Sequence, residues 1–205
     1  MLADKTLKEY LNETASSAPA PGGGSVAALS AGLAAALTAM VAHLTIGKKG
    51  YEELKEEMRA IVQETEKYKE IFVEYIDKDS DSFTQVMKAF KLPKETEEEK
   101  EIRKNKIQEA LKNAALVPLE VARNGLRMMD IIEKAVVKGN KNAVTDGAVA
   151  AMLARTATLS ALYNVKINLG SIKDAEFVDK TQKEVSQIEE DVVRLEKEIL
   201  EKVVL

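Results

Sequence analysis

The chain has 205 residues, no cysteine and a formal net charge of −4, from 30 basic and 34 acidic residues. This length suits one domain with its own core, which we expect to span residues 1–205. The composition excludes disulfides, thiolate catalysis and cysteine-ligated zinc, and the net charge argues against nucleic-acid binding. The first twenty residues lack the basic and apolar regions of a signal peptide, so we expect a cytoplasmic protein.

The composition is typical of a helical protein, because Glu, Lys, Ala and Leu dominate while the chain has only 4 prolines and 10 glycines. The first predicted element is a short amphipathic helix over residues 4–15, with Leu7, Tyr10 and Leu11 on one face. The prolines of the following segment, APAP, stop this helix.

Three consecutive glycines, Gly22 to Gly24, then open a helix of small residues predicted to run from Ser25 to Ile46. We expect Ser25 to be its N-cap residue and Gly47 to end it. The segment is long enough to span a membrane, but Ala, Ser, Thr and Gly contribute little favourable transfer energy and no aromatic belt flanks it. We therefore expect a helix buried among other helices, and no contact with a membrane.

Long helices follow. From Tyr51, apolar residues at steps of three and four predict a helix that ends before Pro93. A charged segment leads into a helix over 96–137, where Pro118 predicts a kink or break. A second small-residue helix follows the loop GNKN, and a stripe over 178–199 predicts a closing helix. We expect an all-α bundle of about six helices, several of them long, with two central small-residue helices. Such stripes often continue across a dimer interface, so we expect a homodimer.

Metal sites have little support in this sequence. The single histidine, His43, and the absence of a Glu-x-x-His pair argue against zinc and di-iron sites. The acidic run that begins at Asp77 fails the EF-hand pattern, since Ser82 and Lys88 stand where Gly and Glu are required. We expect no metal and no cofactor. His43 would have to carry any Ser-His-Asp triad, although a histidine inside such a helix is more often a satisfied core residue.

The acidic run Asp77, Asp79 and Asp81 has two interpretations. On a helix Asp77 and Asp81 share a face, and Asp79 points elsewhere. The run could be a solvated face on which like charges repel each other. Alternatively, one carboxylate is kept for proton transfer, with its pKa raised toward neutrality by burial and by the neighbouring acids.

The glycine turn also has two interpretations. Consecutive glycines allow backbone N–H groups to converge on an anion at a helix N-terminus, but a plain flexible turn would have the same sequence. The loop GNKN precedes the other small-residue helix, so we expect both helix starts to face one pocket. Lys48, Lys49 and Lys141 are available there to hold carboxylates.

Five segments, APAPGGGSVAAL, GKKGY, DKDSDSF…LPK, GNKNAVTDGAVAA and NVKINL, occur in the order and approximate spacing of the formiminotetrahydrofolate cyclodeaminase family. The chain resembles this family, which includes stand-alone methenyltetrahydrofolate cyclohydrolases, over nearly its whole length. The resemblance implies an all-helical, dimeric folate enzyme without metal or redox cofactor. The expected reaction closes 5-formiminotetrahydrofolate to 5,10-methenyltetrahydrofolate with loss of ammonia. The cyclohydrolase reaction, which yields 10-formyltetrahydrofolate, is the alternative, and a non-catalytic helical scaffold dimer is an alternative of another class.

The resemblance also implies roles for particular residues. The essential aspartate of the family lies in the D-x-D…F segment and corresponds to Asp77 or Asp79. Asp146 would bind the amino-pyrimidine edge of the pterin, or cap its helix. Asn164 and Asn168 would present amides to one ligand, or tie helices together. The folate substrate, with or without a polyglutamate tail, would be bound by the glycine turn, the lysines and the polar loops. The expected binding residues are Pro21, Gly22, Gly23, Gly24, Ser25, Lys48, Asn140, Asn142, Asp146, Asn164 and Asn168.

Overall fold

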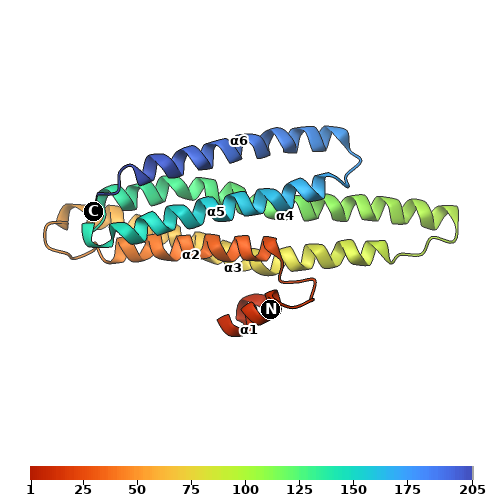
Figure 1. Ribbon diagram of the computed structural model, residues 1–205, viewed down its shortest axis with the longest axis horizontal. Coiled ribbons are helices and arrows are strands. Elements are labelled where there is room, and N and C mark those ends of the chain that lie inside the picture. The colour runs from red at the N-terminus through yellow and green to blue at the C-terminus, as the bar shows by residue number, and fades with distance from the viewer. Residues whose placement is uncertain (205) are drawn as a thin grey trace.

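The computed structural model describes residues 1–204 and consists of helices joined by short loops (Figure 1). No strand occurs among these residues, so the all-α prediction is confirmed. The α-helices are α1 (Leu7–Thr14), α2 (Gly23–His43), α3 (Lys55–Phe90), α4 (Glu97–Lys138), α5 (Val144–Leu169) and α6 (Ala175–Leu200). Short 3-10 turns, η1 (Leu2–Asp4), η2 (Glu52–Leu54) and η3 (Lys141–Ala143), precede three of them.

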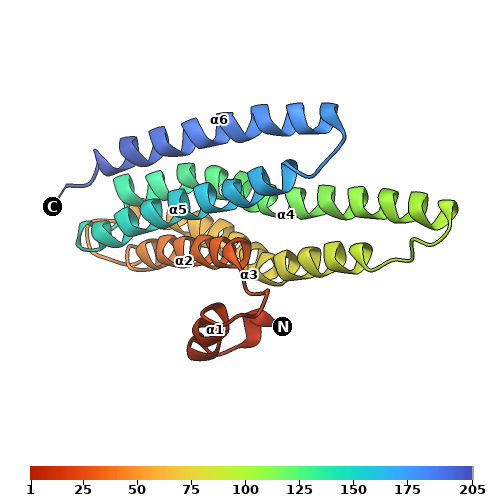
Figure 2. The same ribbon diagram turned by 45° about the vertical axis from the view of Figure 1, so that its right-hand side comes forward.

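The core of the bundle is formed by four helices, with α2 packed on α3 and α5, and α4 packed on α3 and α5. The sixth helix, α6, lies along α4 and α5 on the side away from α2 (Figures 1 and 2). The second half of α3 and the first half of α4 continue past the end of α2 as a pair of helices. The start of α2 therefore lies beside the middle of this long helix pair, where polar side chains can gather outside the core.

Small side chains allow α2 and α5 to occupy the centre. Ala28, Ala31 and Ala35 on α2 are fully buried, as are Ala150 and Ala154 on α5. Such residues let helix backbones approach closely, because no long side chain separates them. The prediction of two central small-residue helices is confirmed.

The start of α2 differs from the prediction. The helix begins at Gly23, and its N-cap is Gly22, which offers no side chain to the first turn. Ser25 is therefore inside the first turn and is not the N-cap residue that we expected. Its side chain is fully buried against α3, so the hydroxyl finds its partner in another helix instead of in its own first turn. Gly22 itself gives no side-chain cap to the first N–H groups of α2.

Among the described residues, α2 is the one helix with the length and hydropathy to cross a membrane. More than half of its most apolar stretch is buried by the other helices of the bundle. That burial fits the interpretation of α2 as a core helix, because its apolar face already has protein partners.

α4 runs without a break from Glu97 to Lys138, which corrects the break predicted at Pro118. Thr96 and Glu99 form a capping box at its start. Proline lacks the N–H that would bind the carbonyl of Ala114, four residues earlier. That carbonyl accepts a hydrogen bond of 2.8 Å from Asn168 of α5, so the tertiary structure satisfies the group that Pro118 leaves free.

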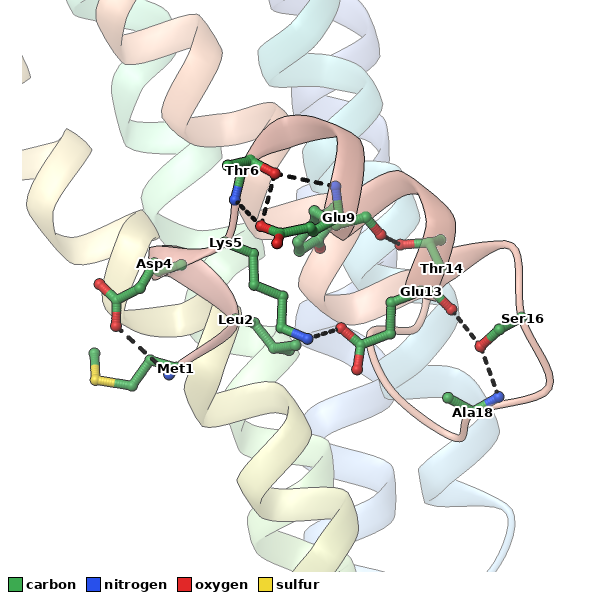
Figure 3. A network of polar contacts seen from close by, with 12 residues as sticks. Met1, Leu2, Asp4, Lys5, Thr6, Glu9, Glu13, Thr14, Ser16 and Ala18 are labelled. Atoms are coloured by element: carbon green, nitrogen blue, oxygen red, sulfur yellow. Dashed lines mark hydrogen bonds and ion pairs between the residues drawn. The ribbon is translucent and has the colours of Figure 1, made fainter.

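The N-terminal segment packs beside α3 as a small separate layer (Figures 1 and 3). Thr6 and Glu9 form a capping box for α1, and Lys5 pairs with Glu13. Tyr10 is buried as predicted, but Leu7 and Leu11 are exposed, so only one residue of the expected apolar face enters the core of the chain. The segment brings η1 and Tyr10 close to the acidic run of α3.

Candidate active site

A cavity of about 340 Å³ opens where the glycine turn meets the middle of α3 and the end of α5. Its walls are formed by the glycine turn and the start of α2, one face of α3, one residue of α4 and the last two turns of α5. Its lining residues are Pro19, Ala20, Gly22, Gly23, Gly24, Asp79, Ser80, Ser82, Phe83, Val86, Ala114, Asn164, Ile167 and Asn168.

Among residues 1–204, Asp79 is the only acidic residue that lines this cavity. Its carboxyl group lies directly against the backbone of Gly24, at the N-terminus of α2. Burial raises the pKa of Asp79 above its ordinary value of 3.8, while the hydroxyl and backbone N–H of Ser25 act in the opposite direction. A raised pKa moves a carboxyl group closer to the pH at which it can both accept and donate a proton.

Ser25 lies behind Asp79, away from the cavity surface. Its Oγ lies 2.9 Å from the carbonyl oxygen of Ile76 and 3.1 Å from Asp79 Oδ2. A hydroxyl has one proton to donate and lone pairs to accept with. Ser25 can therefore donate to an ionised Asp79, or donate to Ile76 and accept from a protonated Asp79. The expected contact between the Ser25 side chain and a ligand does not fit this buried position.

Asp77 has a different environment. It does not line the cavity, and its Oδ1 accepts a hydrogen bond of 2.5 Å from the backbone N–H of Leu2. The N–H of Ala3 lies 3.5 Å from Oδ2. The carboxylate of Asp77 thus holds the N-terminal segment to α3. The sequence left Asp77 and Asp79 as equal candidates, and the geometry distinguishes them.

Tyr10 is a neighbour of both acids that the sequence analysis did not single out as functional. Its hydroxyl is buried and has no hydrogen-bond partner among residues 1–204. Burial, and then the charges of Asp79 and Asp77, raise the pKa of Tyr10 to about 12. In the sequence, a tyrosine on the otherwise apolar face of the N-terminal helix could have indicated that its hydroxyl is placed near the site.

The glycine turn forms one wall of the cavity. Gly22, Gly23 and Gly24 line it, whereas Pro21 is buried beneath and does not. A Cβ on Gly23 would approach Asn164 Nδ2 to 3.3 Å, so the turn and α5 are in close contact. Gly22 offers no side-chain cap and the N–H of Ser25 is paired with the Asp79 carboxyl group, so the N–H groups of Gly23 and Gly24 are the ones that can donate to a ligand.

Asn164 and Asn168 lie one helical turn apart on α5, and both line the cavity. Asn164 Nδ2 donates to the carbonyl of Ser160. Asn168 Nδ2 donates to the carbonyls of Ala114 and Asn164. Asn168 therefore ties α5 to α4, whereas Asn164 bonds only within α5. Both side chains reach the cavity, and their binding of one ligand stays a prediction.

The polar loop GNKN does not face this cavity within the chain. Asn140 bonds the carbonyl of Leu44 and accepts from the N–H of Asn142, while its own N–H donates to Thr45. These contacts are at the C-terminal end of α2, whereas the glycine turn is at its N-terminal end. A helix of 21 residues is roughly 30 Å long. The expectation that both helix starts face one pocket is wrong for a single chain.

Several other candidates share that distant end of α2. They are Lys48, Lys49, Lys141, Asp146 and His43. His43 is the last residue of α2 and is exposed, so neither of its two interpretations, a buried core residue or a triad member beside the cavity, applies within this chain. Three other lysines, Lys88, Lys106 and Lys112, line an adjoining groove of about 790 Å³ between α3 and α4.

Phe83 and Ile167 add an apolar wall that the sequence analysis missed. Both line the cavity, although 42% of Phe83 and 75% of Ile167 is exposed in the single chain. Phe83 is four residues after Asp79, so helical spacing places it on the same face, and this spacing was the available sign.

Comparison with known proteins gives a consistent result. Residues 6–187 match the sequence model of the family described as formiminotransferase-cyclodeaminase. A methenyltetrahydrofolate cyclohydrolase from Methylorubrum extorquens is 38% identical over 203 residues, which cover 99% of this chain and 98% of the relative. The formimidoyltransferase-cyclodeaminase of Rattus norvegicus is 34% identical over 187 residues, but the chain covers 35% of that longer protein.

The solved structure of formiminotetrahydrofolate cyclodeaminase from Thermotoga maritima has the same fold, with a TM-score of 0.89 and 32% sequence identity. The match covers 99% of this chain and 98% of that one. Sequence and fold agree over almost the whole length, so the chain belongs to the formiminotransferase-cyclodeaminase family.

Proposed function

We propose that the protein is a folate one-carbon enzyme that converts 5-formiminotetrahydrofolate to 5,10-methenyltetrahydrofolate and ammonia. The observation that carries the proposal is the position of Asp79, a buried carboxyl group with a raised pKa at the surface of a cavity with an apolar wall. The names of the relatives support a folate substrate. We further propose that the reaction takes place in the cytoplasm and needs no metal or cofactor.

The proposed reaction moves one proton between two nitrogens. N10 attacks the carbon of the formimino group, which is protonated on its nitrogen, and the new bond leaves an extra proton on N10. Asp79, in its ionised form, takes that proton and then gives it to the amino group on the same carbon. The carbon–nitrogen bond to this group breaks, ammonia leaves, and the methenyl cation remains. The charge is balanced, because a cationic substrate gives a cationic product and neutral ammonia.

The arrangement around Asp79 suits this transfer. The carboxyl group must be ionised before the reaction, protonated in the middle and ionised again at the end. Ser25 can pair with it in each state, as donor or as acceptor. The cavity walls would hold the two reacting atoms at close range, which supplies much of the advantage of an intramolecular ring closure.

A second candidate function is the cyclohydrolase reaction, in which water adds to the methenyl carbon and the ring opens to 10-formyltetrahydrofolate. The relative that is 38% identical over nearly its full length favours it. The same carboxyl group would take one proton from the attacking water and give it to N5 as the carbon–N5 bond breaks, and the second water proton would be released to solvent as the formyl carbonyl forms.

Two assays on the purified protein separate these activities. With 5-formiminotetrahydrofolate, a cyclodeaminase is expected to release ammonia and form the methenyl product. With methenyltetrahydrofolate, a cyclohydrolase is expected to consume the substrate faster than it hydrolyses spontaneously. Absence of both activities, together with no binding of folate by calorimetry, would support the non-catalytic scaffold and contradict the proposal.

The lysine-lined groove beside the cavity supports binding of an anionic tail on the substrate. It lies one helical turn further along α3, and Lys88 within it makes no ion pair among the described residues. We propose that a polyglutamate tail extends along this groove. A lower KM for a polyglutamylated substrate than for the monoglutamate would support this position, and equal values would contradict it.

We also propose a homodimer, in which a second copy covers the apolar face that α2 and α5 share. These helices lie side by side (Figures 1 and 2), and α3 and α4 cover their other side. Large apolar side chains are exposed along this face on both helices. They are Val26, Leu33, Met40 and Leu44 on α2, and Val149, Met152, Tyr163 and Ile167 on α5.

A two-fold axis across the middle of α2 would place two copies of this helix antiparallel. The polar loop at one end of α2 would then lie beside the glycine turn of the other copy. In this arrangement Lys48, Asn140, Asn142 and Asp146 reach the cavity from the second chain. This would reconcile their expected role with their distance from the cavity within one chain.

Leu33→Glu is expected to convert the dimer to monomers, because a charge at the centre of this face loses its water on association. Sedimentation velocity measures the mass directly. Ile102→Glu is a matched control, since Ile102 is 52% exposed and Leu33 is 50% exposed, but Ile102 lies on α4 outside the shared face. A monomeric wild-type protein, or a dimer that survives Leu33→Glu, would contradict this interface.

A further inference from the structure

A hydrogen bond from Asn168 to the carbonyl of Ala114, one helical turn before Pro118, links the interior of α4 to the cavity. Pro118 has no N–H, so the carbonyl of Ala114 has no partner within its own helix. Asn168 Nδ2 donates to that carbonyl at 2.8 Å. The side chain from α5 supplies the hydrogen bond that a backbone N–H at position 118 would otherwise make.

The amide of Asn168 is fixed by this contact and by a second one. Its other hydrogen is donated to the carbonyl of Asn164 at 2.9 Å. Both partners are carbonyl oxygens, which only accept, so the NH₂ group must face them and Oδ1 must take the other side. Asn168 lines the cavity, and no residue in the described part of the chain donates to its Oδ1. The side chain therefore has one hydrogen-bonding function left, that of an acceptor.

We propose that Pro118 is a positioning residue, which fixes Asn168 so that Oδ1 is presented to the cavity as an acceptor for an N–H or NH₂ group of the ligand. A freely rotating asparagine could offer a ligand either its donor or its acceptor side. Here the donor side is used by the backbone, so the site selects a ligand with a donor at this position. The inference rests on the proposed function for the class of ligand, an amino-substituted heteroaromatic ring.

Folic acid is the probe for the test, because it has this ring and is not a substrate of either proposed reaction. Pro118→Ala restores an N–H for the Ala114 carbonyl, so its Tm is expected to rise while the Kd for folic acid increases at least about threefold. Asn168→Leu is expected to lower Tm and to increase Kd about tenfold, since it removes the acceptor and leaves the Ala114 carbonyl unpaired.

The double variant tests the link between the two positions. With Ala at 118 the Ala114 carbonyl has a helical partner, so Asn168→Leu should lower Tm less than it does in the wild type. Asn124→Leu is a control, because the Asn124 amide also donates to a helix carbonyl, that of Glu120, but lies outside the cavity. It is expected to change Tm and leave Kd unchanged.

The possible results divide clearly. If wild-type protein binds folic acid but Pro118→Ala binds it equally well, the positioning role is wrong while the proposed function stands. Equal Tm losses from Asn168→Leu in both backgrounds would also overturn it. If the wild type fails to bind folic acid or any reduced folate, the proposed function fails, whereas the Tm comparison still shows whether the two residues are coupled.

Discussion

Asp79→Asn is expected to lower kcat by about 10²–10⁴-fold, the usual contribution of a general acid–base group. The amide has nearly the shape of the carboxyl group but cannot take a proton from N10 or from water. The Kd for folate should stay within about threefold of the wild-type value, because the cavity walls are unchanged. Steady-state rates and calorimetry on the same preparation measure both quantities.

Two neighbouring acids serve as comparisons. Asp81 is exposed and lines no cavity, so Asp81→Asn is expected to retain the wild-type rate. Asp77→Asn loosens the N-terminal segment by weakening the bond from the Leu2 N–H, and we expect a loss of about 1 kcal/mol in stability with a much smaller loss of rate. A larger loss of kcat from Asp77→Asn than from Asp79→Asn would show that Asp77, and not Asp79, transfers the proton.

The raised pKa of Asp79 also predicts how stability depends on pH. In the unfolded chain the carboxyl group has its ordinary pKa of 3.8, and in the folded protein the pKa is higher because of burial. The folded state therefore holds the proton more tightly, and this group contributes most to stability at low pH. Its contribution decreases as the pH rises from about 3.8 through the folded pKa, and is constant above it.

Asp79→Asn removes this titration. The difference in unfolding free energy between variant and wild type should shift in favour of the variant as the pH rises through that window. Denaturant titrations at several pH values from 4 to 8 give this difference. A difference that does not change with pH would show that burial does not perturb Asp79.

The helices could be predicted from the sequence because their limits are set locally. Thr96 and Glu99 form the capping box that begins α4, and Gly139 follows its last residue. The predicted span 96–137 is within one residue of the observed helix. The start of α2 was misplaced because Ser25 has the usual chemistry of an N-cap, whereas its hydroxyl is used by α3. A contact between distant elements overrode a local preference.

The residues that come together in the site could not be predicted from the sequence, because their proximity depends on contacts between distant segments of the chain. Asp77 and Asp79 have the same side chain two residues apart, and only the packing of α3 on the start of α2 distinguishes them. The glycine turn and the loop GNKN were predicted to face one pocket because each precedes a small-residue helix. The length of α2, with one loop at each end, separates them, and this follows once the Asn140 contacts to Leu44 and Thr45 are known.

Gly24→Ala is expected to reduce kcat by about 10²-fold or more, since a displacement of the reacting group by about 1 Å has this effect. A Cβ at position 24 would lie 2.5 Å from Asp79 Cγ and 2.7 Å from Oδ2, and closer still to Oδ1. The carboxyl group must move, or α2 and α3 must separate. Overpacking of this kind costs about 1–3 kcal/mol, which offsets the gain of up to about 1 kcal/mol that Ala usually gives in a helix.

Gly32→Ala is the matched control on the same helix. Its Cβ would lie 3.7 Å from Phe72 Cβ, an ordinary contact, so we expect unchanged activity and a gain in stability of up to about 1 kcal/mol. Thermal unfolding and steady-state rates on both variants provide the comparison. Equal effects of the two substitutions would mean that activity does not depend on the close approach of Gly24 to Asp79.

The sign of the stability change gives the sharpest form of this test. In an Asp79→Ala background the three atoms that block a Cβ at position 24 are absent. Gly24→Ala should then stabilise the protein, as Gly32→Ala does, whereas in the wild type it should not. This reversal depends only on the contact between the two residues, and it can be measured in a protein that is already inactive. It therefore tests the geometry of the site independently of the identity of the substrate.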